Sequence, residues 1–457
     1  MTTDSADTVP STNAVPPDNT VPPDSTVPPD VTVPPDVAGL MHDRLGLFIH
    51  FGLYALAARH EWVASFERIR PEDYRRYFER FDPDLFDAYD WAHQCQQAGM
   101  RYAVLTTKHH EGFCLWDSAY TDYKITNTPF GRDLVAEFVT AFRAAGIKIG
   151  FYHSLLDWHH PDFVIDGHHP LRDSPDLAEL NAGRDMARYR AYLHDQAREL
   201  LTSYGKIDYL FYDFSYPARQ QPQIFNNKGA EDWDSAGLMR MTRELQPGIV
   251  INDRLDLPGD LVTPEQYQPS EPMRNDSGEL VPWEACQTIN GSWGYFRDNT
   301  EFKSPELLVR MLVDGVSKGG NLLFNVGPTG RGTFDPTSAQ ALAGLGEWMR
   351  LHERAIVGAG PSAFVAPPDC RYTQRGDRLY LHLFAWPHQH VHLPGLAGKV
   401  AYAQLLDDAS EIACQEVDPD QEAQNTSMGG LPAGTLTLTL PTRQPAVAVP
   451  VVEIFLS

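Results

Sequence analysis

One carboxylate, Asp213, follows an apolar run with the sequence Ile-Asp-Tyr-Leu-Phe-Tyr at residues 207–212. β-Branched, leucine and aromatic residues fill this run and Pro217 follows it, which predicts a buried strand that ends at Asp213. A carboxylate at the mouth of a buried strand is costly unless it has partners or a catalytic role. From this strand alone, Asp213 could equally cap the next helix or pair with an arginine.

Further polar and aromatic residues cluster at the ends of the predicted strands or lie in the loops beside them. They are His50, Glu61, Trp62, His109, His110, Tyr152, Arg254, Glu284 and Trp293. A single histidine at a strand end is usually structural, but successive strands that all end in polar groups need partners for those groups. Histidine, glutamate and arginine suit sugar hydroxyls, and aromatic faces suit the C–H surface of a sugar ring.

The many histidines of this region also suggest a zinc site. Barrel hydrolases that use zinc usually carry a His-x-His pair at the end of the first strand, whereas this chain has His50-Phe51-Gly52. On a strand, the adjacent His109 and His110 would point in opposite directions and could not easily bind one ion. Metal-assisted hydrolysis is therefore an alternative reading, and we expect neither a metal nor another cofactor.

Short apolar segments alternate with amphipathic ones from about Met41 to Val357, which predicts a parallel α/β barrel. The expected strands are Leu45–His50, Tyr102–Thr107, Lys148–His153, Asp208–Asp213, Ile249–Asn252, Trp283–Ile289 and Asn321–Val326. The expected helices are Asp84–Ala98, Asp133–Ala144, Asn181–Ser203, Asp234–Glu244, Ser304–Ser317 and Thr337–His352. The fold class is thus a (β/α)8-like, TIM-type barrel with irregularities, and a doubly wound open sheet is the alternative. In such a barrel the chemistry lies at the C-terminal ends of the strands.

The two ends of the chain differ from the barrel. Residues 1–37 repeat Val-Pro-Pro-Asp, which predicts a disordered, polyproline-like spacer or, as the alternative, a ligand for a proline-binding module. Residues 38–357 would form the barrel domain. Residues 358–457 contain short alternating segments, such as Thr-Leu-Thr-Leu-Thr-Leu at 435–440, which predict a C-terminal antiparallel β-sandwich.

Composition excludes several kinds of partner. The formal net charge of −24 makes nucleic acid and anionic membranes unsuitable partners. The five cysteines form no CxxC pair, which argues against a disulfide framework and a structural zinc site. The first residues lack the basic and apolar regions of a secretory signal, so a cytoplasmic location is the expectation. The sequence leaves open whether the protein forms a homo-oligomer.

Several strings together resemble the α-L-fucosidases of glycoside hydrolase family twenty-nine. The most distinctive are Lys108-His109-His110-Glu111-Gly112-Phe113 and Gly-Gly-Asn-Leu-Leu-Phe-Asn-Val-Gly-Pro at 319–328. The resemblance covers roughly residues 41–350, and the C-terminal β domain fits the family's architecture, whereas the proline-rich tail does not belong to it. Phe51, Glu111 and Phe211 depart from the residues that are common in the family.

This resemblance implies a retaining, exo-acting α-L-fucosidase whose substrates are fucosylated oligosaccharides or glycosides. Asp213 falls on the family nucleophile, which forms a fucosyl-enzyme intermediate. For the acid/base residue, the sequence context favours Glu284, and Glu265 is the rival. The resemblance assigns fucose binding to His50, Glu61, Trp62, His109, His110, Tyr152, Arg254 and Trp293. A catalytically inactive sugar-binding barrel is the alternative from another class.

Overall fold

The structure is a computed structural model that describes residues 36–416, 422–423, 426–427 and 431–457. The predicted proline-rich tail lies almost entirely outside the described residues. The described chain begins with the short helix α1 (Val37–Asp43), which Asp36 caps through a hydrogen bond from the Gly39 amide.

A parallel sheet of seven strands forms the centre of the first part of the chain, in the order β5-β4-β3-β2-β1-β7-β6. The strands are β1 (Leu45–Ile49), β2 (Tyr102–Lys108), β3 (Lys148–Ser154), β4 (Tyr209–Asp213), β5 (Val250–Ile251), β6 (Glu284–Thr288) and β7 (Asn321–Val326). Nearly every strand residue is buried, because helices cover one face and the barrel interior the other. All the strands run in one direction, so their C-terminal ends meet on one face.

The edges of this sheet are joined by an irregular segment, residues 261–266. Isolated parallel bridges pair Leu261 with Asn252, at the end of β5, and Val262 with Trp283, just before β6. A third bridge pairs Glu265 with Cys286 within β6. The segment thus takes the place of an eighth strand between β5 and β6. The predicted fold class, an irregular TIM-type barrel, is confirmed.

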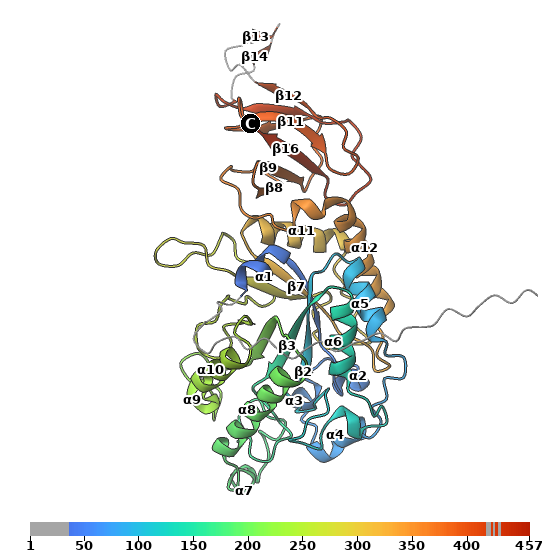
Figure 1. The fold of residues 1–457 in the computed structure, drawn as a ribbon, viewed down its shortest axis with the longest axis vertical. Coiled ribbons are helices and arrows are strands. Elements are labelled where there is room, and N and C mark those ends of the chain that lie inside the picture. Colours follow the sequence, from blue (N-terminus) through green and yellow to red (C-terminus); the bar gives the residue numbers. More distant parts are fainter. Residues whose placement is uncertain (1–35, 417–421, 424–425, 428–430) are drawn as a thin grey trace, which may run out of the picture. The chain divides into compact units, whose positions relative to one another are not determined.

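Helices pack around the sheet in chain order (Figure 1). The long ones are α5 (Ala88–Gln97), α6 (Leu134–Ala144), α8 (Met186–Ser203), α10 (Ser235–Leu245), α11 (Pro305–Ser317) and α12 (Pro336–His352). The short ones are α2 (Tyr54–Ala57), α3 (Val63–Phe66), α4 (Pro71–Phe78), α7 (Leu177–Asn181) and α9 (Ala230–Trp233). Each long helix starts after an Asp or Ser whose side chain accepts a backbone N–H, a cap worth about 1 kcal/mol. These caps explain why α5 begins at Ala88 rather than at the predicted Asp84.

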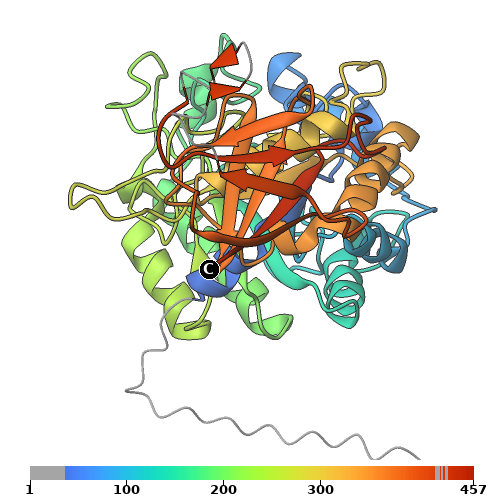
Figure 2. The same ribbon diagram turned by 90° about the horizontal axis from the view of Figure 1, so that it is seen from above.

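The C-terminal part forms two antiparallel sheets, which are in front in Figure 2. One sheet has the order β11-β16-β9-β8 and the other β10-β15-β12. Their strands are β8 (Cys370–Arg375), β9 (Arg378–Leu383), β10 (His390–Leu393), β11 (Val400–Leu405), β12 (Ala413–Glu416), β15 (Leu436–Thr439) and β16 (Val451–Leu456). A separate pair, β13 (Glu422–Ala423) and β14 (Thr426–Ser427), forms a two-stranded sheet. Leucine and valine side chains of both larger sheets share one hydrophobic cluster, which confirms the predicted β-sandwich.

The sandwich packs on the barrel through α11 and α12. Helix α11 contacts β8, and the indole N–H of Trp348 in α12 donates to the Val449 carbonyl at 3.0 Å. Tyr380 and Val451 of the sandwich belong to the same hydrophobic cluster as the barrel core. The domain boundary at residue 357 stays a prediction. Within the described residues, no helix has the length and apolar character needed to cross a bilayer.

Candidate active site

A cavity with an empty volume of about 360 Å³ opens at the C-terminal ends of the barrel strands. It is lined by Phe48, His50, Trp62, His109, His110, Tyr152, Phe211, Asp213, Phe214, Arg254, Glu265, Cys286 and Trp293. The sequence predicts eleven site residues. Nine of them, Glu265 included, line this cavity. Glu61 and Glu284 do not line it.

Asp213 is the last residue of β4, and both of its carboxylate oxygens are fixed. The Tyr152 hydroxyl donates to Oδ2 at 2.8 Å, and Arg254 Nη1 donates to Oδ1 at 2.9 Å. The next residue, Phe214, has a φ of 82°, a left-handed conformation that costs a bulky residue about 1–3 kcal/mol. Such strain persists only where the surroundings enforce it, so the backbone that leaves Asp213 is held firmly.

Arg254 joins Asp213 to Glu265. The same nitrogen, Nη1, also donates to Glu265 Oε2 at 2.6 Å. Because both oxygens bind one nitrogen, at 2.9 and 2.6 Å, they can be at most 5.5 Å apart. Retaining glycosidases hold their two carboxyl groups about 5–5.5 Å apart, whereas inverting enzymes need about 6.5–9.5 Å. The upper limit for these two oxygens lies below the inverting spacing and is compatible with a retaining pair.

The surroundings of Asp213 shift its pKa in opposite directions. Burial raises the pKa of Asp213 above its ordinary value and the nearby Glu265 raises it further, while Arg254 and Tyr152 pull this pKa down. A carboxylate that acts as the nucleophile usually has an ordinary or lowered pKa, and burial acts on Asp213 in the opposite direction. The Asp213 side chain is 11% exposed and that of Glu265 42%, so Glu265 is the more accessible of the two carboxylates.

Glu284 lies at the wrong end of the barrel for the acid/base role that the sequence context suggested. It is the first residue of β6, pairs with Asn321 at the start of β7, and is fully buried. Its carboxylate accepts a hydrogen bond from the Tyr102 hydroxyl at the start of β2, and burial raises its pKa to about 7. The prediction of Glu284 as acid/base is therefore corrected: the barrel floor, not its mouth, holds this carboxyl.

His50 follows β1 and presents one defined nitrogen to the cavity. Its Nδ1 lies 2.7 Å from Asn325 Oδ1, and Asn325 Nδ2 donates to the Trp293 carbonyl at 2.7 Å. Since Oδ1 can only accept, Nδ1 of His50 carries the proton and Nε2 is left as an acceptor. Burial lowers the pKa of His50 to about 3, so the ring is neutral at neutral pH.

His109 and His110 both line the cavity, because β2 ends at Lys108 and the chain turns at this pair. The opposite orientation expected on a strand therefore does not apply, and the ring centroids lie 4.0 Å apart. Ser154 donates its hydroxyl to the Leu156 carbonyl, so it accepts from His110 Nδ1 at 2.7 Å. Among the described residues, His109 Nδ1 is buried without a hydrogen-bond partner. Burial lowers the pKa of both histidines.

Aromatic rings form the walls. Trp62 lies 5.1 Å from Phe214 and 5.0 Å from His110 between centroids, and Trp293 lies 5.1 Å from His50. Glu61 is placed beside this cavity: its Oε2 accepts the Gly294 amide at 2.8 Å, and its side chain lines a neighbouring hollow with His60 and Phe66. Burial raises the pKa of Glu61 to about 7.

Several contributing residues were not found from the sequence. Asn325, Ser154, Phe48, Phe214 and Cys286 orient or line the site. Asn325 is the one with a visible signal, a polar residue that follows the apolar residues Leu322, Leu323 and Phe324. The others resemble ordinary core or turn residues.

Glu111 fixes the loop that follows β1. Its Oε1 accepts the Leu53 amide at 2.8 Å, and its Oε2 accepts the Tyr74 hydroxyl. Gly52 leaves the space for this contact, since a Cβ there would lie 2.5 Å from Glu111 Oε1. Burial raises the pKa of Glu111 to about 8, so this carboxyl is mostly protonated in the folded protein at pH 7.

This raised pKa predicts a pH-dependent stability. A carboxyl with a folded pKa of about 8 stabilises the fold fully below its unfolded pKa of about 4.3, and this contribution is lost as the pH rises through 8. Glu111→Gln mimics the protonated group, so we expect the free energy of unfolding to fall less steeply between pH 5 and 8.5, by up to about 1.4 kcal/mol per pH unit. Urea unfolding at several pH values measures this slope. The exposed Glu347→Gln serves as control, and parallel curves for wild type and Glu111→Gln would contradict the assignment.

A TIM-type barrel with two carboxyl groups this close at its mouth has the arrangement of a retaining glycoside hydrolase. The family model described as alpha-L-fucosidase matches residues 40–354. Because this match covers more than half of the chain, the protein belongs to the α-L-fucosidase family, and the resemblance seen in the sequence is confirmed.

Solved structures and curated proteins agree with this membership. Alpha-L-fucosidase isoenzyme 1 from Paenibacillus thiaminolyticus is 43% identical with a TM-score of 0.84, and the similarity covers 92% of this chain and 98% of that one. A trapped covalent intermediate of a Bacteroides thetaiotaomicron α-L-fucosidase is 27% identical with a TM-score of 0.77, over 92% of this chain and 95% of that one. The tissue alpha-L-fucosidase of Homo sapiens is 28% identical over 374 residues, 76% of this chain and 75% of that protein.

Proposed function

We propose that this protein is a retaining α-L-fucosidase with Asp213 as the nucleophile and Glu265 as the acid/base residue. The observation that carries the proposal is the shared contact of both carboxylates with Arg254 Nη1, which keeps the two bound oxygens closer together than an inverting mechanism allows. The covalent intermediate trapped in the Bacteroides thetaiotaomicron relative supports the two-step course.

In the first step, Asp213 attacks the anomeric carbon while Glu265 donates its proton to the departing glycosidic oxygen. The C–O bond to the leaving group breaks as the bond to the Asp213 oxygen forms. In the second step, the Glu265 carboxylate removes a proton from water, whose oxygen attacks the anomeric carbon and releases Asp213. Two inversions restore the original configuration. The positive charge of Arg254 stabilises the anionic partner in each step.

The cavity binds one deoxy sugar. Neutral His50 and His110 each offer a ring nitrogen to ring hydroxyls, and unpartnered His109 Nδ1 offers another. Trp62 and Trp293 provide apolar faces for the C–H surface and the methyl group. Glu61 supports this cavity from its neighbouring position. A fucosylated oligosaccharide or glycoside is the substrate class that this arrangement fits, and the proposed mode of attack is exo.

The experiment is hydrolysis of 4-nitrophenyl α-L-fucoside followed by proton NMR. We expect 4-nitrophenol release, with α-L-fucose as the first anomer to appear before mutarotation. β-L-Fucose as the first product would contradict the retaining pair. Undiminished activity after exhaustive chelation is also expected, since the proposed steps use only Asp213, Glu265 and water.

The acid side of the pH profile follows from the raised pKa of Asp213. Catalysis needs the Asp213 anion, so kcat/KM falls as the pH drops through this pKa, above the ordinary aspartate value of about 3.9. Glu265 contributes to the shift, so Glu265→Gln is expected to move this acid limb to lower pH. A pH series with a substrate that needs no acid assistance, 2,4-dinitrophenyl fucoside, measures the limb. A limb that stays in place or moves upward in Glu265→Gln would contradict the predicted coupling.

A further inference from the structure

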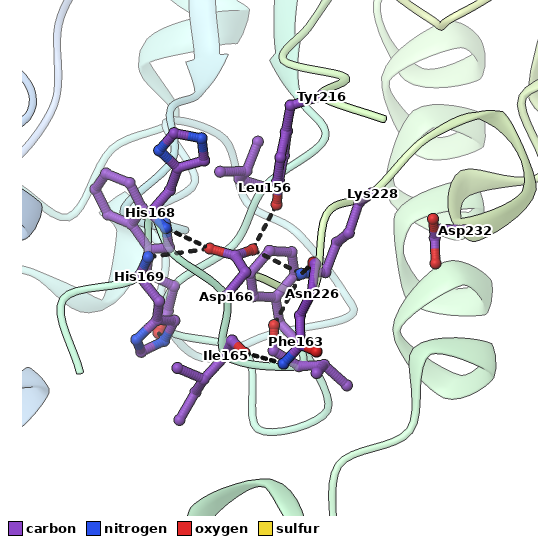
Figure 3. A network of polar contacts seen from close by, with 12 residues as sticks. Leu156, Phe163, Ile165, Asp166, His168, His169, Tyr216, Asn226, Lys228 and Asp232 are labelled. Atoms are coloured by element: carbon purple, nitrogen blue, oxygen red, sulfur yellow. Dashed lines mark hydrogen bonds and ion pairs between the residues drawn. The ribbon is translucent and has the colours of Figure 1, made fainter. Parts of the chain in front are cut away.

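A buried ion pair lies outside the sugar cavity and takes no part in the two chemical steps. Lys228 Nζ and Asp166 Oδ2 are 2.6 Å apart, and the two side chains are 2% and 0% exposed (Figure 3). Neither residue lines the cavity. Taking two charges out of water is costly, and their attraction offsets that cost only when the remaining polar atoms are also satisfied.

Every polar position of this pair is used. Asp166 Oδ1 accepts the backbone amides of His168 at 2.8 Å and His169 at 3.0 Å, and Oδ2 also accepts the Tyr216 hydroxyl. Lys228 Nζ donates further to the Val164 carbonyl at 2.9 Å and to the Asn226 carbonyl at 3.2 Å. These contacts, seen together in Figure 3, join the loop after β3 to the loop after β4.

The joined loops carry the aromatic wall of the cavity. The backbone amide of Tyr216 donates to the Lys228 carbonyl at 2.8 Å. Two positions before Tyr216 is Phe214, whose ring lies 5.1 Å from Trp62 and 5.1 Å from His168. The His168 ring in turn lies 5.7 Å from Trp62, and the His168 carbonyl accepts the Ser65 hydroxyl at 2.7 Å.

Phe214 also occupies the strained conformation that follows Asp213 directly. A strained residue keeps its conformation only if fixed groups on both sides enforce it. On one side β4 is fixed by the Leu155 amide, which donates to the Asp213 carbonyl at 2.9 Å. On the other side, Tyr216 is fixed by Asp166 and Lys228.

We propose that Asp166 and Lys228 are positioning residues for the reaction: the ion pair holds Tyr216, and through it Phe214, so that the Phe214–Trp62 wall and the Asp213 carboxylate keep their places around the sugar. The inference rests on the proposed function of Asp213. Its effect passes through the loops rather than through direct contact with substrate. Misplacement of reacting groups by about 1 Å can cost about 10²-fold in rate.

The test compares Lys228→Met, Asp166→Asn and the double variant, with kcat, KM and thermal unfolding measured for each. Each single variant leaves one buried group without its counter-charge, so we expect a lower Tm and a ten- to hundredfold fall in kcat/KM. The double variant removes both charges. We expect it to regain much of the Tm but not kcat/KM, because the asparagine of Asp166→Asn has a single carbonyl oxygen. It cannot accept from both the His168 and His169 amides and the Tyr216 hydroxyl, as Asp166 does.

The matched control is Lys318→Met, which breaks a Lys–Asp contact of the same 2.6 Å length with Asp314 at the end of α11. It should leave kcat/KM within about twofold. Tyr216→Phe deletes only the hydroxyl and tests the proposal if the charge variants do not fold. This variant should have a lower kcat and should be inhibited less strongly by free fucose.

Recovery of both Tm and kcat/KM in the double variant would overturn the proposal, because the pair would then be structural only. Wild-type kcat/KM in folded Lys228→Met or Tyr216→Phe would overturn it as well. If the wild-type protein hydrolyses no fucoside, the proposed function fails first. Calorimetric binding of fucose to the same variants then decides the positioning role separately, with weaker binding in Lys228→Met expected and unchanged binding contradicting it.

Discussion

Asp213→Ala should lower kcat on 4-nitrophenyl α-L-fucoside by at least about 10⁴-fold, the scale of loss when a covalent nucleophile is removed. Both oxygens of the carboxylate at the end of β4 are fixed, by Tyr152 and Arg254, and this carboxylate supplies the bond that forms in the first step. Added azide should replace it and give the fucosyl azide of inverted configuration, because the small anion enters the space that the side chain leaves.

A matched control lies at the other end of the same segment. Asp208 precedes β4, bonds the Ile149 amide at 2.9 Å and lies away from the cavity. Asp208→Asn should keep kcat near the wild-type value, whereas Asp213→Asn should lose it. Near-normal turnover of a folded Asp213→Ala protein, judged by circular dichroism, would refute the nucleophile assignment.

Glu265→Gln has the second largest expected effect. General acid–base catalysis contributes about 10²–10⁴-fold, so kcat/KM should fall by this amount for oligosaccharides, whose alkoxide leaving groups need a proton. For 2,4-dinitrophenyl fucoside the first step needs little assistance, and kcat/KM should stay close to that of the wild type. Azide should restore turnover with this substrate and give fucosyl azide with the configuration of the substrate.

Glu284→Gln tests which of the two glutamates is the acid/base residue. Gln keeps an oxygen that accepts from Tyr102 at the barrel floor, so kcat, its dependence on the leaving group and its response to azide should resemble those of the wild type. If Glu284→Gln shows the leaving-group dependence and azide response, and Glu265→Gln does not, the geometric assignment is wrong.

The barrel could be predicted from the sequence because its strands are short, apolar and bounded by turns. Burial on both faces requires such runs, as in β1, β2 and β7. The closure of the barrel could not be predicted. Residues 261–266 have no strand pattern, and they are held by bridges to β5 and β6 that exist only once both edges are in place.

The sequence also favoured the wrong glutamate, Glu284 instead of Glu265, as the acid/base residue. Glu284 stands next to aromatic and apolar residues that suggested a site, but it opens its strand instead of ending it, and the opening end of a barrel strand faces the floor. The expected strand Trp283–Ile289 already placed Glu284 near its start, so the strand prediction was accurate here and the sequence context of Glu284 was misleading. Glu265 belongs to the irregular segment, so only its contact with Arg254 reveals its position.

Trapping with 2-fluoro-fucosyl fluoride tests the central claim most directly. The fluorine at C2 slows hydrolysis of the fucosyl-enzyme, while the fluoride leaving group lets the intermediate form. The covalent intermediate should therefore accumulate, most of all in Glu265→Gln, where no base activates water. Digestion and tandem mass spectrometry should place one added fluorofucosyl group on Asp213. An added group on Glu265, on Glu284 or on any other residue, or turnover without any covalent adduct, would contradict the account.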